Sequence, residues 1–176
     1  MDKTLYNAYV SILKEELLPA MGCTEPIAVA YAAAVALREL DAIPEKVEIV
    51  VSGNIIKNVK SVVVPNTGGL RGLAAAAAAG IVAGNADKEL QVIASVSEEY
   101  RGYIARFLEI AKFTIRESDS DYIFDIDLRL YAGKRSSRCR IAGYHTNIIR
   151  IERNGKILKD VPYTEVGRTT PRTVLF

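Results

Sequence analysis

Cysteine and histidine are scarce in this chain of 176 residues, which contains two cysteines and one histidine. Two cysteines are too few for a disulfide framework in a domain of this size. The sequence has no CxxC pair, and His145 has no ligand-like spacing to Cys23 or Cys139. These absences argue against a disulfide-stapled secreted scaffold and against a zinc site of the usual spacing.

An excess of charge of either sign is also lacking. The chain has 23 Lys and Arg against 21 Asp and Glu, a formal net charge of +2. Proteins that attract nucleic acid do so with a strong positive field, so we expect no nucleic-acid partner. The one basic cluster is interpreted as a solvated edge that could meet an anion; it comprises Lys134, Arg135, Arg138 and Arg140.

Long apolar runs are missing as well. The most apolar stretch, residues 26–37, is closed by Arg38 and Glu39, well short of the roughly 20 residues that span a membrane. Charged residues 14–16 interrupt the apolar pattern of the N-terminus, unlike the apolar region of a signal peptide. We therefore expect no membrane partner and a reducing, cytoplasmic location.

Phosphate-binding loops are likewise absent from the sequence. The glycine pair in Asn66–Gly69 lacks both the lysine and the spacing of a nucleotide-binding loop. Hydrophobic residues make up 49% of the chain and charged residues 25%, which is the balance of a globular protein with ample material for a core. The sequence thus predicts a globular domain without a nucleotide fingerprint.

Apolar residues at three- and four-residue steps predict helices. The expected helices cover residues 5–17, 25–40, 70–82 and 95–113. Thr24 is the expected N-cap of the second, which is apolar nearly all round and should be central to the core. The last should begin with a capping box of Ser95 and Glu98.

Alternating and β-branched residues predict strands. The expected strands cover residues 45–51, 59–65, 122–130 and 136–142, followed by a hairpin turning at Asn154–Gly155. Residues 52–58 are interpreted as a polar turn. This order predicts an α+β fold, with helices packed on one face of a mixed or antiparallel β-sheet. We expect a domain over residues 1–160 and an irregular tail over 161–176.

Cys23 is the first candidate for chemistry. If Thr24 caps the helix, the thiol lies beside unpaired backbone N–H groups and the positive end of the helix dipole, which favours the thiolate. The alternative is that Cys23 is a small buried hydrophobe. Cys139 lies in an apparent strand, where alternation places it in the core.

Two turns are further candidates, because glycine allows close backbone approach to a carboxylate or an amino acid. They are residues 52–58, where Lys57 could neutralise an anion, and residues 66–69. Both could equally be ordinary turn formers. His145 lies in a polar insertion between apolar strands and is either structural or a site residue.

Three stretches together resemble a known family: LLPAMGCTEPIAVAYAAAVA, SGNIIKNVKSVVVPNTGG and GYHTNIIRIERNGKIL. They are similar to the N-terminal half of the L-cysteine desulfidase family, which is related to the iron–sulfur L-serine dehydratase α chain. The resemblance extends from Met1 to about Asp160. The MGCTEP and VPNTGG motifs are its most specific parts.

The resemblance implies a lyase that converts cysteine to pyruvate, ammonia and sulfide, using a [4Fe–4S] cluster as a Lewis acid. Cys23 would be a cluster ligand or a catalytic base, and Glu25, beside it in the motif, is the second expected catalytic residue. The positions expected to bind the substrate carboxylate and amine are Asn54, Lys57, Asn58, Asn66, Thr67 and His145.

The resemblance also has a limit. Members of that family are longer, and their other cluster cysteines lie in a C-terminal half that has no counterpart here. We therefore expect this chain alone to bind no cluster and to be inactive, and to be either a split half that needs a C-terminal partner chain or a truncated remnant. We also expect it to form a homo-oligomer through an exposed apolar face. The alternative function is a non-enzymatic domain that binds an amino acid or a protein.

Overall fold

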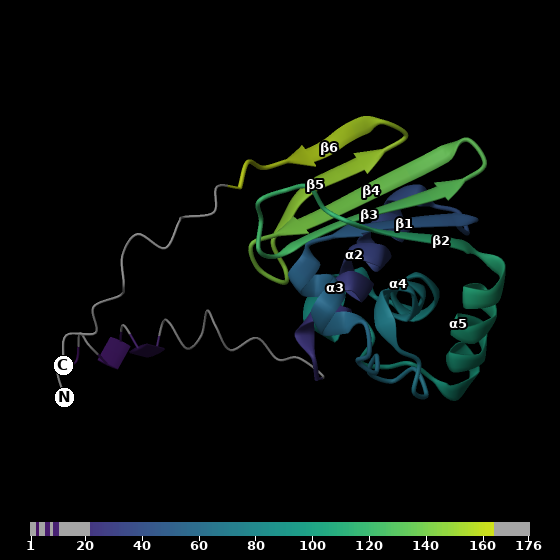
Figure 1. Cartoon of the computed structure of the whole chain (residues 1–176), viewed down its shortest axis with the longest axis horizontal. Coiled ribbons are helices and arrows are strands. Elements are labelled where there is room, and N and C mark those ends of the chain that lie inside the picture. The colour runs from purple at the N-terminus through teal and green to yellow at the C-terminus, as the bar shows by residue number, and fades with distance from the viewer. Residues whose placement is uncertain (1–2, 4–5, 8, 11–21, 164–176) are drawn as a thin grey trace.

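A computed structural model describes residues 3, 6–7, 9–10 and 22–163 of the chain (Figure 1). Of the helix predicted for residues 5–17, only residues 6–7 and 9–10 are described, and they are helical; the rest of it and most of the predicted tail lie outside the described residues.

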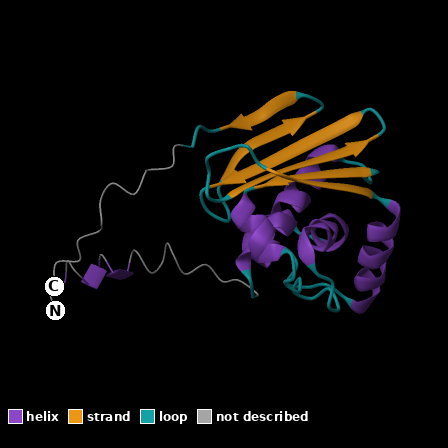
Figure 2. Cartoon of the chain, in the orientation of Figure 1, coloured by secondary structure: helices purple, strands orange, loops and turns teal. Residues whose placement is uncertain are grey.

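The described elements form one mixed six-stranded sheet with helices against it. In chain order they are α2 (Thr24–Leu40), β1 (Lys46–Val51), α3 (Gly53–Val59), α4 (Gly72–Ala83), η1 (Ala86–Gln91), α5 (Glu98–Ile110), β2 (Lys112–Glu117), β3 (Asp125–Ala132), β4 (Arg135–Ala142), β5 (Ile148–Arg153) and β6 (Lys156–Asp160). The strand order is β2-β1-β3-β4-β5-β6. Strand β2 runs parallel to β1, and the other neighbours are antiparallel. Figure 2 shows the helices on one side of this sheet, which confirms the predicted α+β fold.

Helix α2 lies at the centre of the core, as its sequence predicts. Every residue from Ile27 to Ala36 is buried. Helix α4 packs against it so closely that a Cβ added to Gly80 would lie 2.0 Å from the carbonyl oxygen of Ala30. Both helices are rich in alanine, and these small side chains let the two backbones lie close together.

The inner face of the sheet completes this core. Alternate side chains of β1, β3 and β4 point toward the helices and are fully buried; they include Val47, Ile49, Ile126, Leu128 and Ile141. Cys139 lies among them with no exposed surface, so the prediction that it is a core residue is confirmed.

The outer face of the sheet carries paired charges instead. Arg138 donates two hydrogen bonds to Asp127, at 2.8 and 2.7 Å, and Arg140 donates two to Asp125, at 2.8 and 2.9 Å. The prediction of a solvated basic edge is therefore wrong for these two arginines. Their guanidinium groups are engaged by carboxylates from the neighbouring strand, which the sequence could not reveal because the partners are 11 and 15 residues away.

Two predicted segments between β1 and α4 differ in the structure. Residues 52–58 were predicted as a polar turn, but Gly53–Val59 is helix α3, because Ile55 and Val59, four residues apart, both bury their side chains. Residues 59–65 do not form a strand; only Val63 makes an isolated bridge, to Arg71. This β-branched segment buries Val64 in the core, but it pairs with no neighbouring strand.

The last predicted helix is shorter than expected and begins later. Its N-cap is Ser97 and not Ser95. The Ser97 side chain accepts a hydrogen bond from the backbone N–H of Tyr100. It ends at Ile110, and Lys112–Glu117 forms strand β2. This edge strand pairs parallel to β1, a long-range contact that local periodicity does not encode.

Candidate functional site

Cys23 occupies the N-cap position of helix α2. Its backbone is extended, with φ −63° and ψ 122°, and its side chain makes no capping hydrogen bond to the described first turn. Thr24 is therefore the first helical residue, and its predicted role as N-cap is wrong. The chain enters this position through Gly22, whose φ of +127° is strained for any residue with a side chain. The thiol is thus presented at the surface, beside the start of a 17-residue helix.

The nearest partner of the thiol is a carboxylate. Cys23 Sγ donates a hydrogen bond to Glu25 Oε2 at 3.0 Å. Glu25 lies in the first turn of α2, where the helix dipole favours a negative charge. Its other oxygen, Oε1, accepts a hydrogen bond from Asn58 Nδ2 at 3.4 Å, from the end of α3. The carboxylate is therefore held between a thiol and an amide.

His145 lies in the loop between β4 and β5, near enough to Glu25 for their charges to interact. Its half-buried ring packs against Phe124, with ring centroids 4.6 Å apart. The Nε2 atom is buried and has no hydrogen-bond partner among the described residues. Glu25 and His145 interact electrostatically, since a charge on His145 lowers the pKa of Glu25. The contact between the rings of Phe124 and His145 joins residues 21 apart, and no motif in the sequence indicates it.

Protonation states follow from these contacts. Burial, and then the hydrogen bond to Glu25 and its negative charge, raise the pKa of the Cys23 thiol. The hydrogen bond from Cys23 is the largest of the effects that lower the pKa of Glu25, and burial lowers the pKa of His145. These shifts favour a protonated thiol beside an ionised carboxylate and a neutral imidazole, and so they run against the expected thiolate. Burial is the largest cause at Cys23, followed by the hydrogen bond to Glu25.

Among the described residues, no hydrogen bond joins the other predicted substrate residues to Cys23, Glu25 or His145. Asn54 and Lys57 are exposed on α3. Asn66 donates a hydrogen bond to the carbonyl of Ile93 at 3.0 Å, and the buried Thr67 hydroxyl donates to the carbonyl of Val64 at 2.8 Å. The last two side chains hold their own loop in place, so they are engaged in structure, and their substrate role stays a prediction.

The residues present do not fit a [4Fe–4S] cluster held by this chain. Such clusters are bound by about four thiolates, and the chain has two cysteines. Cys139 is fully buried in the sheet, where burial raises its pKa, whereas Cys23 is exposed. Within the described ranges, no group of three His, Cys, Asp or Glu side chains could hold a metal ion. The reaction proposed below therefore uses no cluster.

In the part of the chain that the structure describes, no helix combines the length and the apolar character needed to cross a bilayer.

Comparison with known proteins shows similarity to proteins named UPF0597. The UPF0597 protein of Desulfitobacterium hafniense is 53% identical over 153 residues, covering 87% of this chain and 36% of that protein. The one of Treponema denticola is 40% identical over 178 residues, covering 99% of this chain and 41% of the relative. The one of Fusobacterium nucleatum is 42% identical over 156 residues, covering 89% and 36%. The chain thus spans about two fifths of the length of these relatives.

These matches correct the family expected from the sequence. No model of a known protein family matches the chain, and no solved structure matches it. The relatives carry the UPF0597 name and not that of an L-cysteine desulfidase or an L-serine dehydratase. The expected membership of the desulfidase family is therefore wrong, and motif positions matched to that family lose that support.

Proposed function

We propose that this chain contributes an acid–base site for a small amino acid to a larger UPF0597-type protein, and that the reaction is that of a lyase. The observation that carries the proposal is the hydrogen bond from the Cys23 thiol to the Glu25 carboxylate at the start of α2. A thiol and a carboxylate in direct contact form a unit through which a proton can move to and from a bound molecule.

The first step is removal of the proton on the α-carbon. Once the substrate ammonium is bound beside the thiol, Cys23 passes its proton to Glu25, and the sulfur then takes the α-proton of the substrate. The electron pair of the C–H bond forms a double bond between the α- and β-carbons, and the β-substituent leaves with its own bonding pair. An ammonium group of the substrate near the thiol favours this step, because positive charge lowers a thiol pKa.

The surrounding groups suit an amino-acid substrate. The first turn of α2 has N–H groups without intrahelical partners, and such groups bind carboxylates. Asn58 holds the Glu25 carboxylate, and the neutral His145 offers a ring nitrogen without a described partner. A free, exposed thiol suits a reducing compartment, so we place this chemistry in the cytoplasm.

The test is turnover by a chimera. This chain would replace the matching 153-residue segment of the Desulfitobacterium relative, and pyruvate and ammonia would be measured with L-serine and with L-cysteine. We expect Cys23→Ala to lower turnover by about a hundredfold or more, as for loss of an acid–base group. Lys156→Ala, at an exposed position on strand β6, is the matched control. Undiminished turnover by the Cys23 variant would contradict the proposal.

A second candidate function is amino-acid binding without catalysis. The raised pKa of Cys23 favours it, because a thiol that stays protonated is a hydrogen-bond donor and not a base. Calorimetry with L-serine distinguishes the two: binding that Glu25→Gln abolishes, together with an inactive chimera, supports this candidate. Absence of heat with the full chain and with the chimera contradicts both.

A further inference from the structure

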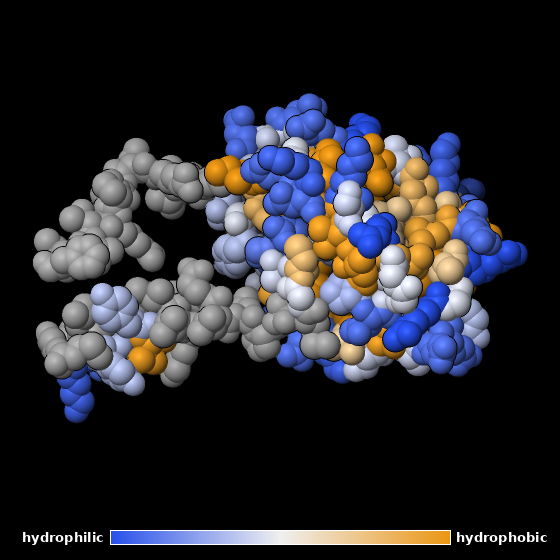
Figure 3. Space-filling model, turned by 60° about the horizontal axis from the view of Figure 1, so that its bottom comes forward, coloured by the Kyte–Doolittle hydropathy of each residue, from blue (hydrophilic) through white to orange (hydrophobic). Residues whose placement is uncertain are grey.

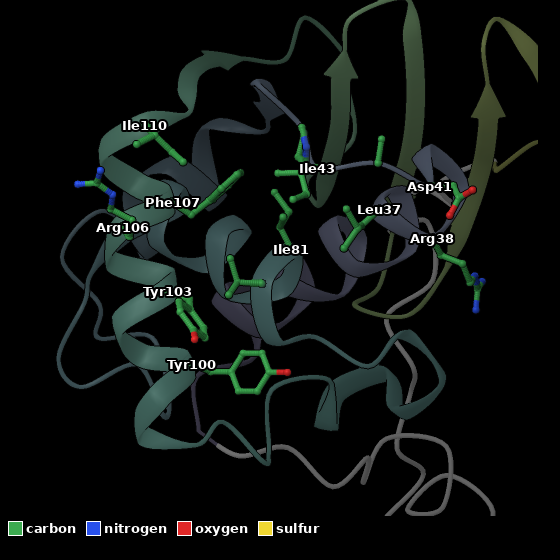
Figure 4. A pocket seen from close by; sticks show the side chains of 13 residues that line it. Leu37, Arg38, Asp41, Ile43, Ile81, Tyr100, Tyr103, Arg106, Phe107 and Ile110 are labelled. Carbon is green, nitrogen blue, oxygen red and sulfur yellow. The ribbon is translucent and has the colours of Figure 1, made fainter.

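A hollow of about 850 Å³ lies at the end of α2 opposite to Cys23 (Figure 4). Helix α5 forms one wall, the last turns of α2 and α4 form the floor, and residues 41–44 form the rim. None of the residues that line it belongs to the Cys23 site. The hollow is therefore a separate feature of the surface.

The side chains around the hollow are unusually exposed for their type. Ile43 is 80% exposed, Ile110 65% and Tyr103 53%. Figure 3, which brings the helical side forward, shows hydrophobic side chains at the surface of this side between charged ones. Single exposed apolar residues are ordinary, but several around one concavity mark a surface that another molecule covers.

The size of the hollow matches a helix. A helix about 10 Å across with its side chains occupies roughly 400 Å³ per turn. The hollow thus has room for about two turns. Because α5 already forms a wall, an incoming helix would pack side by side with α5.

One stripe of α5 combines apolar side chains with charges of opposite sign. Glu99, Tyr103, Arg106 and Ile110 follow at steps of four, three and four residues, which places them on one face of the helix. Tyr103 and Arg106 both line the hollow. The acidic residue thus precedes the basic one by seven residues, with the tyrosine between them. Two copies of such a stripe are complementary when they run in opposite directions.

Gly102 supports close approach at the middle of this helix. Glycine destabilises a helix interior, and a Cβ added at Gly102 would meet none of the described residues within 4 Å. Contacts among the described residues therefore do not require glycine there. A second backbone crossing near this point would require it.

The geometry points to a symmetric dimer in which α5 of a second copy lies in the hollow, antiparallel to α5 of the first. Glu99 of each copy then faces Arg106 of the other, and the two Tyr103 rings meet near the two-fold axis. In such an isologous interface each contact occurs twice. The interface is independent of the proposed acid–base site, since it lies at the other end of α2.

Sedimentation equilibrium of the full chain and three charge variants tests the dimer. Glu99→Lys and Arg106→Glu should each weaken dimerisation on the order of tenfold or more, because each places two like-charged pairs at the interface. The double variant Glu99→Lys/Arg106→Glu restores both pairs and should dimerise like the original chain. Lys156→Glu, an exposed charge reversal on β6, is the matched control and should change nothing. Circular dichroism confirms that each variant is folded.

Three results overturn the inference. A chain that stays monomeric at every concentration shows that a second copy does not fill the hollow. A dimer that neither single variant weakens shows that the copies meet elsewhere. Weakened dimers that the double variant does not restore exclude the antiparallel arrangement, and would leave another part of a longer UPF0597-type polypeptide as the occupant.

Discussion

Cys23 and Cys139 are the two cysteines of this chain, and they occupy opposite environments. Cys139 lies in β4 with no exposed surface, where its sulfur fills space between the sheet and the helices. Cys23 lies at the start of α2, exposed, with its hydrogen directed at a carboxylate. The same side chain is thus a packing unit in one region and a proton donor in the other.

The difference shows that burial and partners decide the role of a thiol. The pKa of both thiols is raised, and burial is the largest cause at each. At Cys23 the hydrogen bond to Glu25 is the next largest cause. Glu25 is an acceptor that can take a proton, whereas the apolar core around Cys139 cannot. A raised pKa therefore accompanies an inert thiol in one place, and in the other a thiol in contact with a carboxylate, which we propose as an acid–base pair.

The largest expected difference between the two sites concerns stability. Cys139→Asp should lower the free energy of unfolding by about 3–5 kcal/mol, because it buries an unpaired charge in the core. Cys23→Asp should change it by less than about 1 kcal/mol, since position 23 is exposed and aspartate is a good N-cap. Urea denaturation of the two variants measures both values. Equal losses would contradict the contrast.

Alkylation separates the two thiols by rate. In the folded chain iodoacetamide should modify Cys23 faster than Cys139 by on the order of a hundredfold or more, because Cys139 reacts only when the core opens. Mass spectrometry of peptides from a time course gives both rates. In denaturant the two rates should converge, which serves as the control. Comparable rates in the folded protein would show that β4 is not a closed part of the core.

Removing the Glu25 carboxylate tests how far it raises the pKa of the Cys23 thiol. Glu25→Gln removes the negative charge that helps to raise the thiol pKa, so that pKa should fall and more thiolate should be present near neutral pH. Alkylation of Cys23 should then be about three- to tenfold faster, as thiolate fraction rises while its nucleophilicity falls slightly. Glu45→Gln, at an exposed position outside the site, should leave the rate unchanged. Slower alkylation of Cys23 in the Glu25→Gln variant would show that Glu25 lowers the thiol pKa instead of raising it.

The smallest expected effect is a gain in stability. Cys23 is at an N-cap without a capping hydrogen bond, and serine is among the best residues there. Cys23→Ser should therefore stabilise the fold by about 0.5–1 kcal/mol, whereas Cys23→Ala should not. Thermal and urea unfolding measure the difference. If Cys23→Ser does not raise the free energy of unfolding, then cysteine at this N-cap position does not destabilise helix α2 relative to serine.

Local patterns predicted those elements whose determinants are local. Helix α2 follows from its apolar sequence, strand β4 from alternation, and the β5–β6 hairpin from Asn154–Gly155, both of which have positive φ as the turn requires. Strand β2 and helix α3 were missed for different reasons. The first depends on parallel pairing with β1, and in the second two buried residues four apart were masked by polar neighbours.

The site could be predicted only in part. Cys23 and Glu25 are two residues apart, so their proximity follows from the sequence alone. Asn58 joins them from 33 residues beyond Glu25 and His145 from a distant loop, and no spacing encodes that. The helix terminus alone predicts a lowered thiol pKa, whereas burial and then the hydrogen bond to Glu25 raise the pKa of Cys23, and neither is encoded by the local spacing.

The most direct test of the central claim is a titration of the cysteine side chains by NMR, using cysteine labelled at its β-carbon. We expect Cys23 to ionise at a higher pH than an ordinary thiol, whose pKa is roughly 8.5, and Glu25→Gln to move this midpoint down. Its resonance should also shift at acid pH, as Glu25 becomes protonated, and lose that shift in the variant. Ionisation of Cys23 below the ordinary value, unaffected by Glu25→Gln, would contradict the shared proton and with it the acid–base site.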